Sequence, residues 1–155
     1  MTESPRVRSW RLAGALCGVV VALDQASKAI VQSSLVPGES VRALPGVEIT
    51  NVHNKGVAFG LAGGAGIVVI LLAVAALVLI LATFARDPRR RGLWIPIGLL
   101  AGGALGNLAD RIRMDSVTDF IDLPLWPAFN LADSCITIGV LSLLYVLEGP
   151  PRHAD

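Results

Sequence analysis

Residues 65–85 read AGIVVILLAVAALVLILATFA and contain no charged side chain. The hydrocarbon core of a bilayer is about 30 Å thick, and a helix of about 20 apolar residues crosses it. The stretch has this length and is apolar throughout. It therefore predicts a transmembrane helix, and the rest of the chain can be interpreted outward from it.

Three further stretches qualify as spans, at residues 12–31, 93–109 and 131–147. Of the 155 residues, 54% are hydrophobic and 16% are charged, whereas about a quarter are charged in a soluble domain. This composition excludes a soluble globule, a disordered chain and a disulfide scaffold. We expect an α-helical membrane protein whose residues 1–155 form one membrane-embedded domain. A cleaved signal peptide at 12–31 is disfavoured, because the stretch holds two charges and lacks a small-residue cleavage site.

The basic residues indicate the orientation of the spans, because Lys and Arg are enriched in short cytoplasmic loops. Eight of the 13 basic residues would share one side of the membrane: Arg6, Arg8, Arg11, Arg86, Arg89, Arg90, Arg91 and Arg152. That side is predicted to be cytoplasmic, with an arm at 1–11, a tail at 148–155 and both termini inside. The connections 32–64 and 110–130 then face outward.

The outer connections carry strand-like runs. Residues 41–44 and 47–52 are split by the turn signal Pro45-Gly46, and residues 116–123 form another run. We expect a small extracytoplasmic β-sheet on the outer membrane surface.

Asp24 and Lys28 lie four residues apart within the first span, acid first, so they share one helix face. An ionisable group inside a span is costly and normally faces a partner or a cavity. Two interpretations stay open. The two residues form a self-satisfied ion pair that docks the helix to its neighbours, or they border a functional site.

Other polar residues would lie at the same depth, near the outer leaflet boundary. Asn54 precedes the second span, Asn107, Asp110 and Arg111 lie at the outer end of the third, and Asp133 begins the fourth. Residues from separate parts of the chain thus converge on one level, which predicts a site at the outer face.

Local alternatives exist for several acids. Asn130 and Asp133 have the spacing of a helix N-cap and a carboxylate that complements the helix dipole, and Asp119 fits a solvated loop acid. Gly98, Gly102 and Gly106 would let another helix approach closely, and we favour packing within the bundle over homodimerisation.

Five segments resemble the motifs of bacterial lipoprotein signal peptidase (signal peptidase II), in the order of that family. They are DQASK at 24–28, NKGVAFG at 54–60, GGALGNLADR at 102–111, VTDFID at 117–122 and FNLADS at 129–134. Five separated motifs in order are specific where one alone would be weak, and the resemblance covers nearly the whole chain. Val57 stands where the family more often has Ala.

The resemblance implies a membrane aspartyl endopeptidase that removes the signal peptide of a prolipoprotein by cutting immediately before its diacylglyceryl-modified cysteine. It implies a catalytic pair, three substrate-binding residues and four supporting residues: Asp119 and Asp133; Asn54, Asn107 and Arg111; and Asp24, Lys28, Asp110 and Asn130. Two carboxyl groups in contact share a proton, so one activates water while the other polarises the scissile carbonyl.

The implied setting is the bacterial inner membrane, with a multi-pass chain, an outer β-cradle and an active site near the outer face. The expected partners are the lipidated prolipoprotein and membrane lipid, with no nucleic acid, no cofactor and no required oligomer. His53 has no companion His or Cys at ligand spacing, so no metal site is expected.

Two other functions fit parts of the pattern. An ion or proton transporter could use Asp24 and Lys28 as a relay, but a relay needs ionisable residues at several depths and the inner halves of the four predicted spans have none. A packing subunit of a larger complex would tolerate alanine at Asp119 and Asp133.

Overall fold

The computed structural model describes residues 3–55 and 65–148. The elements follow in the order α1 (Pro5–Ser34), β1 (Ser40–Leu44), β2 (Val47–Asn54), α2 (Ala65–Arg86), α3 (Trp94–Met114), β3 (Val117–Leu123), β4 (Trp126–Phe129) and α4 (Leu131–Glu148). Helices and a small antiparallel sheet are both as the sequence predicts.

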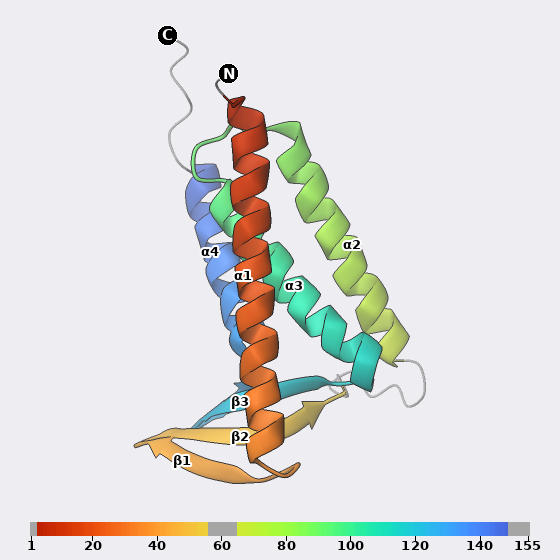
Figure 1. Ribbon diagram of the computed structural model, residues 1–155, viewed down its shortest axis with the longest axis vertical. Coiled ribbons are helices and arrows are strands. Elements are labelled where there is room, and N and C mark those ends of the chain that lie inside the picture. The colour runs from red at the N-terminus through yellow and green to blue at the C-terminus, as the bar shows by residue number, and fades with distance from the viewer. Residues whose placement is uncertain (1–2, 56–64, 149–155) are drawn as a thin grey trace.

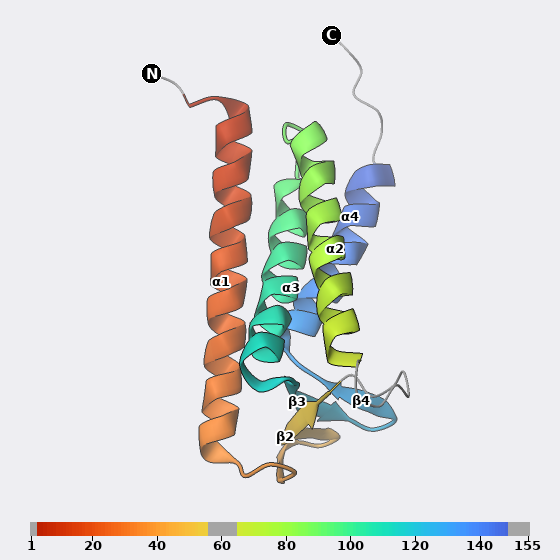
Figure 2. The same cartoon turned by 90° about the vertical axis from the view of Figure 1, so that its right-hand side faces the viewer.

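Helix α3 occupies the middle of the bundle and contacts α1, α2 and α4. The sheet lies across one end of the bundle, and the start of α1 and the end of α4 lie at the other end (Figure 1). Turning the view by 90° shows α1 and α4 on opposite sides of α3 (Figure 2). The bundle and the sheet therefore meet where the third helix ends.

Glycines on α3 allow its neighbours to approach closely. A Cβ atom added to Gly102 would lie 2.6 Å from the Cβ of Val20 on α1, and one added to Gly98 would lie 2.9 Å from the Cβ of Leu16. A Cβ atom at Gly103 would lie 2.5 Å from the carbonyl oxygen of Ala132 on α4. The glycines thus serve contacts within the bundle, which agrees with the interpretation favoured from their spacing.

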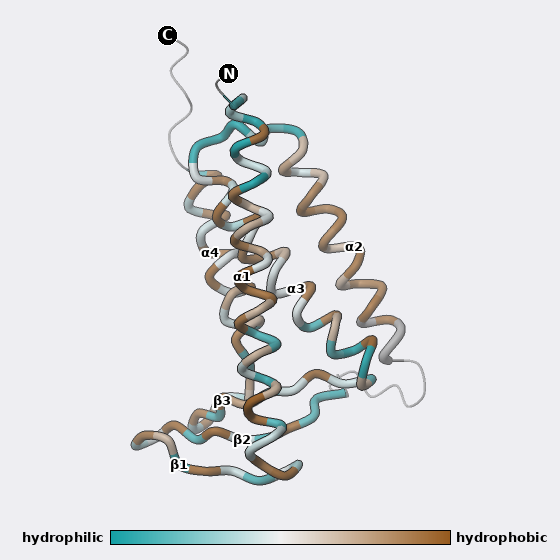
Figure 3. Tube along the Cα trace, viewed as in Figure 1, coloured by the Kyte–Doolittle hydropathy of each residue, from teal (hydrophilic) through white to brown (hydrophobic). Residues whose placement is uncertain are grey.

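The outside of the bundle is apolar. Helices α1 and α4 are long and apolar enough to cross a bilayer, and Ile70–Arg86 of α2 is a shorter apolar helix. Only 22% of the apolar window of α1 and 17% of that of α4 are buried in the protein. Figure 3 shows the hydrophobic colour along α2 and the polar colour gathered at the lower end of α3. This distribution suits a bundle surrounded by lipid.

The sheet joins the two predicted outer connections. Strands β1 and β2 form a hairpin around Gly46, whose φ of 78° is favourable for glycine. Strand β3 pairs antiparallel with β2, so residues 119 and 52 lie opposite each other. Strand β4, which the sequence did not predict, pairs with β3.

Two helices extend several residues beyond the predicted spans. Helix α1 begins inside the predicted arm, because Ser4 accepts a hydrogen bond from the backbone N–H of Val7 and Pro5 occupies the first helical turn. Helix α3 continues past residue 109 and ends where Asp115 adopts a left-handed conformation. Asn107, Asp110 and Arg111 are therefore all helical.

Replacing Gly102 by Ala should destabilise the protein. The new methyl group would overlap Val20, and overpacking of this kind costs about 1–3 kcal/mol. Gly18→Ala on α1 is the matched control, because no atom lies within 4 Å of the added Cβ. Thermal unfolding in detergent micelles should show a lower midpoint for Gly102→Ala alone, and equal midpoints for the two variants would contradict the packing described.

Candidate active site

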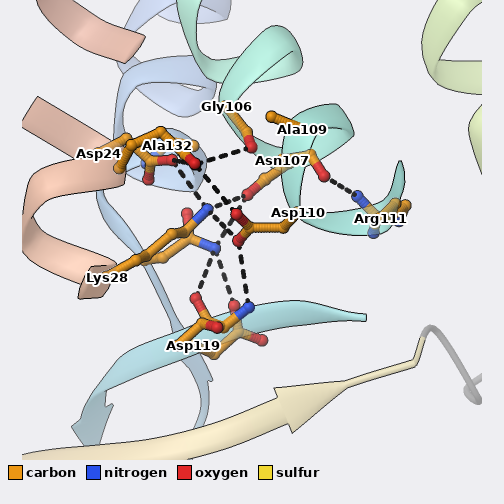
Figure 4. A network of polar contacts seen from close by, with 12 residues as sticks. Asp24, Lys28, Gly106, Asn107, Ala109, Asp110, Arg111, Asp119 and Ala132 are labelled. Carbon is orange, nitrogen blue, oxygen red and sulfur yellow. Dashed lines mark hydrogen bonds and ion pairs between the residues drawn. The ribbon is translucent and has the colours of Figure 1, made fainter. Parts of the chain in front are cut away.

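A buried lysine forms the centre of the polar cluster. Lys28 is 2% exposed, and its Nζ lies 2.8 Å from Asp24 Oδ2, 2.9 Å from Asp110 Oδ2 and 2.9 Å from Asn107 Oδ1. The ammonium group thus has three acceptors from two helices (Figure 4). We call these four residues the Lys28 cluster. The ion pair of Asp24 and Lys28 docks α1 to α3 at the polar level, as the first of the two interpretations predicts.

Asp24 extends the cluster to α4. Its Oδ1 accepts a hydrogen bond of 3.0 Å from the backbone N–H of Ala132, in the first turn of α4. Gln25 adds a bridge that the sequence did not single out, because its Nε2 lies 3.1 Å from Asp24 Oδ2 and 3.0 Å from Asp110 Oδ1. One buried carboxylate therefore ties the first helix to the start of the fourth.

Two amides link the cluster to both predicted catalytic acids. Asn107 accepts from Lys28 and donates from Nδ2 to Asp133 Oδ1 at 2.7 Å. Asn130 donates from Nδ2 to Asn107 Oδ1 at 3.1 Å and to Asp119 Oδ1 at 2.9 Å. Asp119 and Asp133, which are remote in the chain, are thereby attached to one hydrogen-bonded network.

The N-cap predicted at Asn130 is confirmed. The backbone N–H of Asp133 donates to Asn130 Oδ1 at 2.9 Å, and the backbone N–H of Asn130 donates to Asp133 Oδ2 at 3.2 Å. This reciprocal arrangement is a capping box. The cap also leaves the side-chain amide of Asn130 directed toward Asp119, so capping and membership of the site are compatible.

Asp119 is a buried residue of β3, and not the solvated loop acid that its local sequence suggests. Asn54 reaches it from β2, donating from Nδ2 to Asp119 Oδ2 at 3.0 Å. Asn54 is paired with Val117, two residues before Asp119, so the two side chains lie on the same face of the sheet. The sequence did not predict that Asp119 is buried, because its burial depends on the pairing of β2 with β3, which lie in separate connections.

Burial raises the pKa of Asp119 above its ordinary value, and the negative charge of Asp133 raises it further. The hydrogen bonds from Asn54 and Asn130 and the charge of Lys28 oppose this change and lower the pKa. The carboxyl group therefore keeps its proton to a higher pH than an exposed aspartate does.

Arg111 is less closely involved than the other predicted residues. Its Nη1 donates to the carbonyl oxygen of Asn107 at 3.4 Å, one turn back on its own helix, and its side chain lies away from Lys28 (Figure 4). Arg113, which the sequence did not single out, lies 3.7 Å from Asp110 Oδ1. Residues 56–60 of the second motif lie outside the described residues.

An apolar groove of about 550 Å³ opens beside Asp133. Trp126 and Phe129 of β4 line one side, and Thr137 and Ile138 of α4 line the other. Ile138 is 53% exposed and belongs to the apolar outer face of α4. The groove thus joins the apolar outer face of α4 to a carboxylate, and it could place an apolar segment next to Asp133.

The chain matches a family model described as Signal peptidase (SPase) II over residues 16–148. It is 41% identical over 134 residues to the lipoprotein signal peptidase of Moorella thermoacetica, covering 85% of this chain and 89% of that protein. It is 44% identical over 137 residues to the lipoprotein signal peptidase of Syntrophomonas wolfei, covering 84% and 90%.

A solved structure described as a bacterial membrane enzyme, obtained by the in meso method at 1.9 Å resolution, superposes with a TM-score of 0.83 at 31% identity, covering 90% of this chain and 94% of that one. The family model, the relatives and the shared fold agree over most of the chain. The chain belongs to the signal peptidase II family and is a membrane-embedded protease of the lipoprotein signal peptidase type.

Proposed function

We propose that this chain cleaves the signal peptide of prolipoproteins immediately before the diacylglyceryl-modified cysteine, with Asp119 and Asp133 as its catalytic acids. The observation that carries the proposal is the position of Asn130. Its side chain bonds to Asp119, and its backbone N–H bonds to Asp133. An acid pair joined in this way has the parts that hydrolysis of an amide by water requires.

Asp119 would carry the proton and Asp133 would activate water. The raised pKa of Asp119 suits a group that must donate a hydrogen bond to the scissile carbonyl. Asp133 lies in the first turn of α4, where the helix dipole favours a negative charge. Asp133 takes a proton from water and passes it to the leaving nitrogen, while the proton that Asp119 lends to the carbonyl oxygen returns when the tetrahedral intermediate collapses, so the two acids act as one unit.

The remaining predicted residues take supporting parts. Asn107 and Asn130 hold the acids, Lys28 holds Asn107, and Asp24 and Asp110 hold Lys28. Asn54 and Arg111 lie at the edge of the network, where they could contact the substrate backbone or its lipid-bearing cysteine. The groove beside Asp133 would receive an apolar part of the substrate from the bilayer.

The site would lie near the outer face of the bacterial inner membrane. Four spans with both termini in the cytoplasm put the sheet outside, where water can reach the peptide bond while the lipid tails stay in the bilayer. A single copy would suffice, because the described network of carboxyl and amide groups comes from one chain.

Asp119→Asn and Asp133→Asn should each lower cleavage of a diacylated precursor by at least about 100-fold, since general acid–base catalysis contributes ~10²–10⁴-fold. Purified protein and a synthetic lipidated precursor would give the rates, with thermal unfolding to verify folding. Asp122→Asn on the same strand is the matched control and should keep its activity. Substantial cleavage by either of the first two variants would refute the assignment.

Lipid dependence tests the substrate class separately. The wild-type chain should cut the diacylated precursor and leave the unlipidated form intact. Equal cleavage rates on the two forms would show that the enzyme does not require the diacylglyceryl group, although it would still be a peptidase.

Activity should decline as the pH rises through the raised pKa of Asp119, because the proton on that acid is then lost. Asn54→Val removes a hydrogen bond that lowers this pKa, so it should move the alkaline limb of the kcat profile to higher pH. His53→Gln controls for the neighbouring imidazole and should leave the limb in place. The assignment would be contradicted if the alkaline limb moved in His53→Gln, or if it moved to lower pH in Asn54→Val.

Reporter fusions test the orientation. A fusion ending within residues 86–92 should give a cytoplasmic signal, and one ending within 36–41 should give an external signal, because the arginine-rich loops stay inside. The reverse pattern would put the acid pair on the wrong face.

A further inference from the structure

The residue before Asp119 is anchored from three parts of the protein. Thr118 is fully buried, and its backbone N–H donates to Asp110 Oδ2 at 3.3 Å. Its carbonyl oxygen accepts from Asn130 Nδ2 at 3.3 Å. Its Oγ1 accepts from Gln32 Nε2 at 2.6 Å, the shortest of the three distances. The backbone that carries Asp119 is therefore fixed from α1, from α3 and from the residue before α4.

Gln32 continues the polar face of α1. It lies four residues after Lys28 and eight after Asp24, so all three side chains point the same way from the helix. Its amide also lies 3.7 Å from the sulfur of Met114 at the end of α3. The face of α1 that carries the buried ammonium of Lys28 therefore also carries, one turn later, the Gln32 amide that binds Thr118 on β3.

We propose that Gln32 and Thr118 form a positioning pair, which fixes the backbone of β3 so that the Asp119 carboxyl group stays aligned with Asp133. Neither residue would touch the substrate. Because the pair acts through Asp119, its effect on catalysis rests on the proposed function.

The geometry explains how the pair would act. Successive side chains of a strand point to opposite faces, so the Thr118 hydroxyl is directed away from the carboxyl group that it positions. Asn130 Nδ2 has two hydrogens and three acceptors, on Asn107, Thr118 and Asp119. A shift of the Thr118 carbonyl would therefore change how this amide is shared with Asp119.

The pair can be broken with little disturbance of the fold. Valine has nearly the shape of threonine, and Gln32 is exposed, so its amide can return to water. Thr118→Val and Gln32→Ala should each lower kcat for the diacylated precursor by about 10- to 100-fold, the scale of a small misplacement of a catalytic group. KM should stay as in the wild type in both variants, and Thr118→Val should keep the unfolding temperature. Gln32→Ala should lower the unfolding temperature slightly, because the buried Thr118 hydroxyl loses its partner.

The pH profile gives a second readout. Water admitted beside a displaced Asp119 weakens the burial that raises its pKa, so the alkaline limb of kcat should move to lower pH. The charged groups that act on Asp119 are Lys28 from α1, Arg111 from α3 and Asp133 from α4, and none of them is changed by these variants.

Matched variants separate positioning from stability. Thr118→Ser keeps a hydroxyl and should restore kcat, and Ser33→Ala should leave it unchanged, because Ser33 bonds within α1 to Ile30. The double variant Gln32→Ala with Thr118→Val should be no slower than the slower single variant, since both remove the same contact.

Full kcat in both Thr118→Val and Gln32→Ala would overturn the proposal, as would a loss of kcat that tracks the unfolding temperature and persists in Thr118→Ser. Asp119→Asn in the same assay distinguishes the two levels. If that variant is inactive while the pair variants are fully active, the positioning role alone fails. If Asp119→Asn is active, the proposed function fails.

Discussion

An ammonium group removed from water must be surrounded by acceptors, because an unpaired buried charge costs several kcal/mol. Lys28 meets this requirement with Asp24, Asp110 and Asn107. The acceptors lie on two helices, so the requirement can be met only when α1 and α3 pack at one register. Asn107 then holds Asp133, and through Asn130 it holds Asp119. The position of both acids thus depends on the neutralisation of one lysine.

Close packing of the helices makes this network compact. The Lys28 cluster needs backbones near enough for short side chains to meet, and glycines supply that proximity. A Cβ atom on Gly106 would lie 2.6 Å from Asp24 Oδ2, inside the cluster itself. The same helix therefore provides smooth contact surfaces along its length and hydrogen-bonding groups at its end. This division suits a membrane protein, in which apolar helices gain little from burial against one another and depend on packing and polar contacts.

The parts predictable from sequence were those with a local or depth-related signal. The helices followed from long, predominantly apolar stretches, the Asp24–Lys28 pair from its spacing, and the cap at Asn130 from residue type. The pairing of β2 with β3 was not predictable, because strands of seven or eight residues from separate connections carry no signal of their partner. Burial of Asp119 and Thr118 depends on that pairing. Gln32 could have been found from its spacing to Lys28, but its partner could not.

The order of the chain has a consequence for biogenesis. Asp24 and Lys28 enter the membrane first, while Asp110, Asn130 and the backbone N–H of Ala132 that Asp24 binds are still unsynthesised. The contacts that surround Asp24 and Lys28 in the folded protein can therefore be completed only after the start of α4 has been synthesised. A nascent chain that stops short of α4 lacks one of the two acids and the cap that orients it.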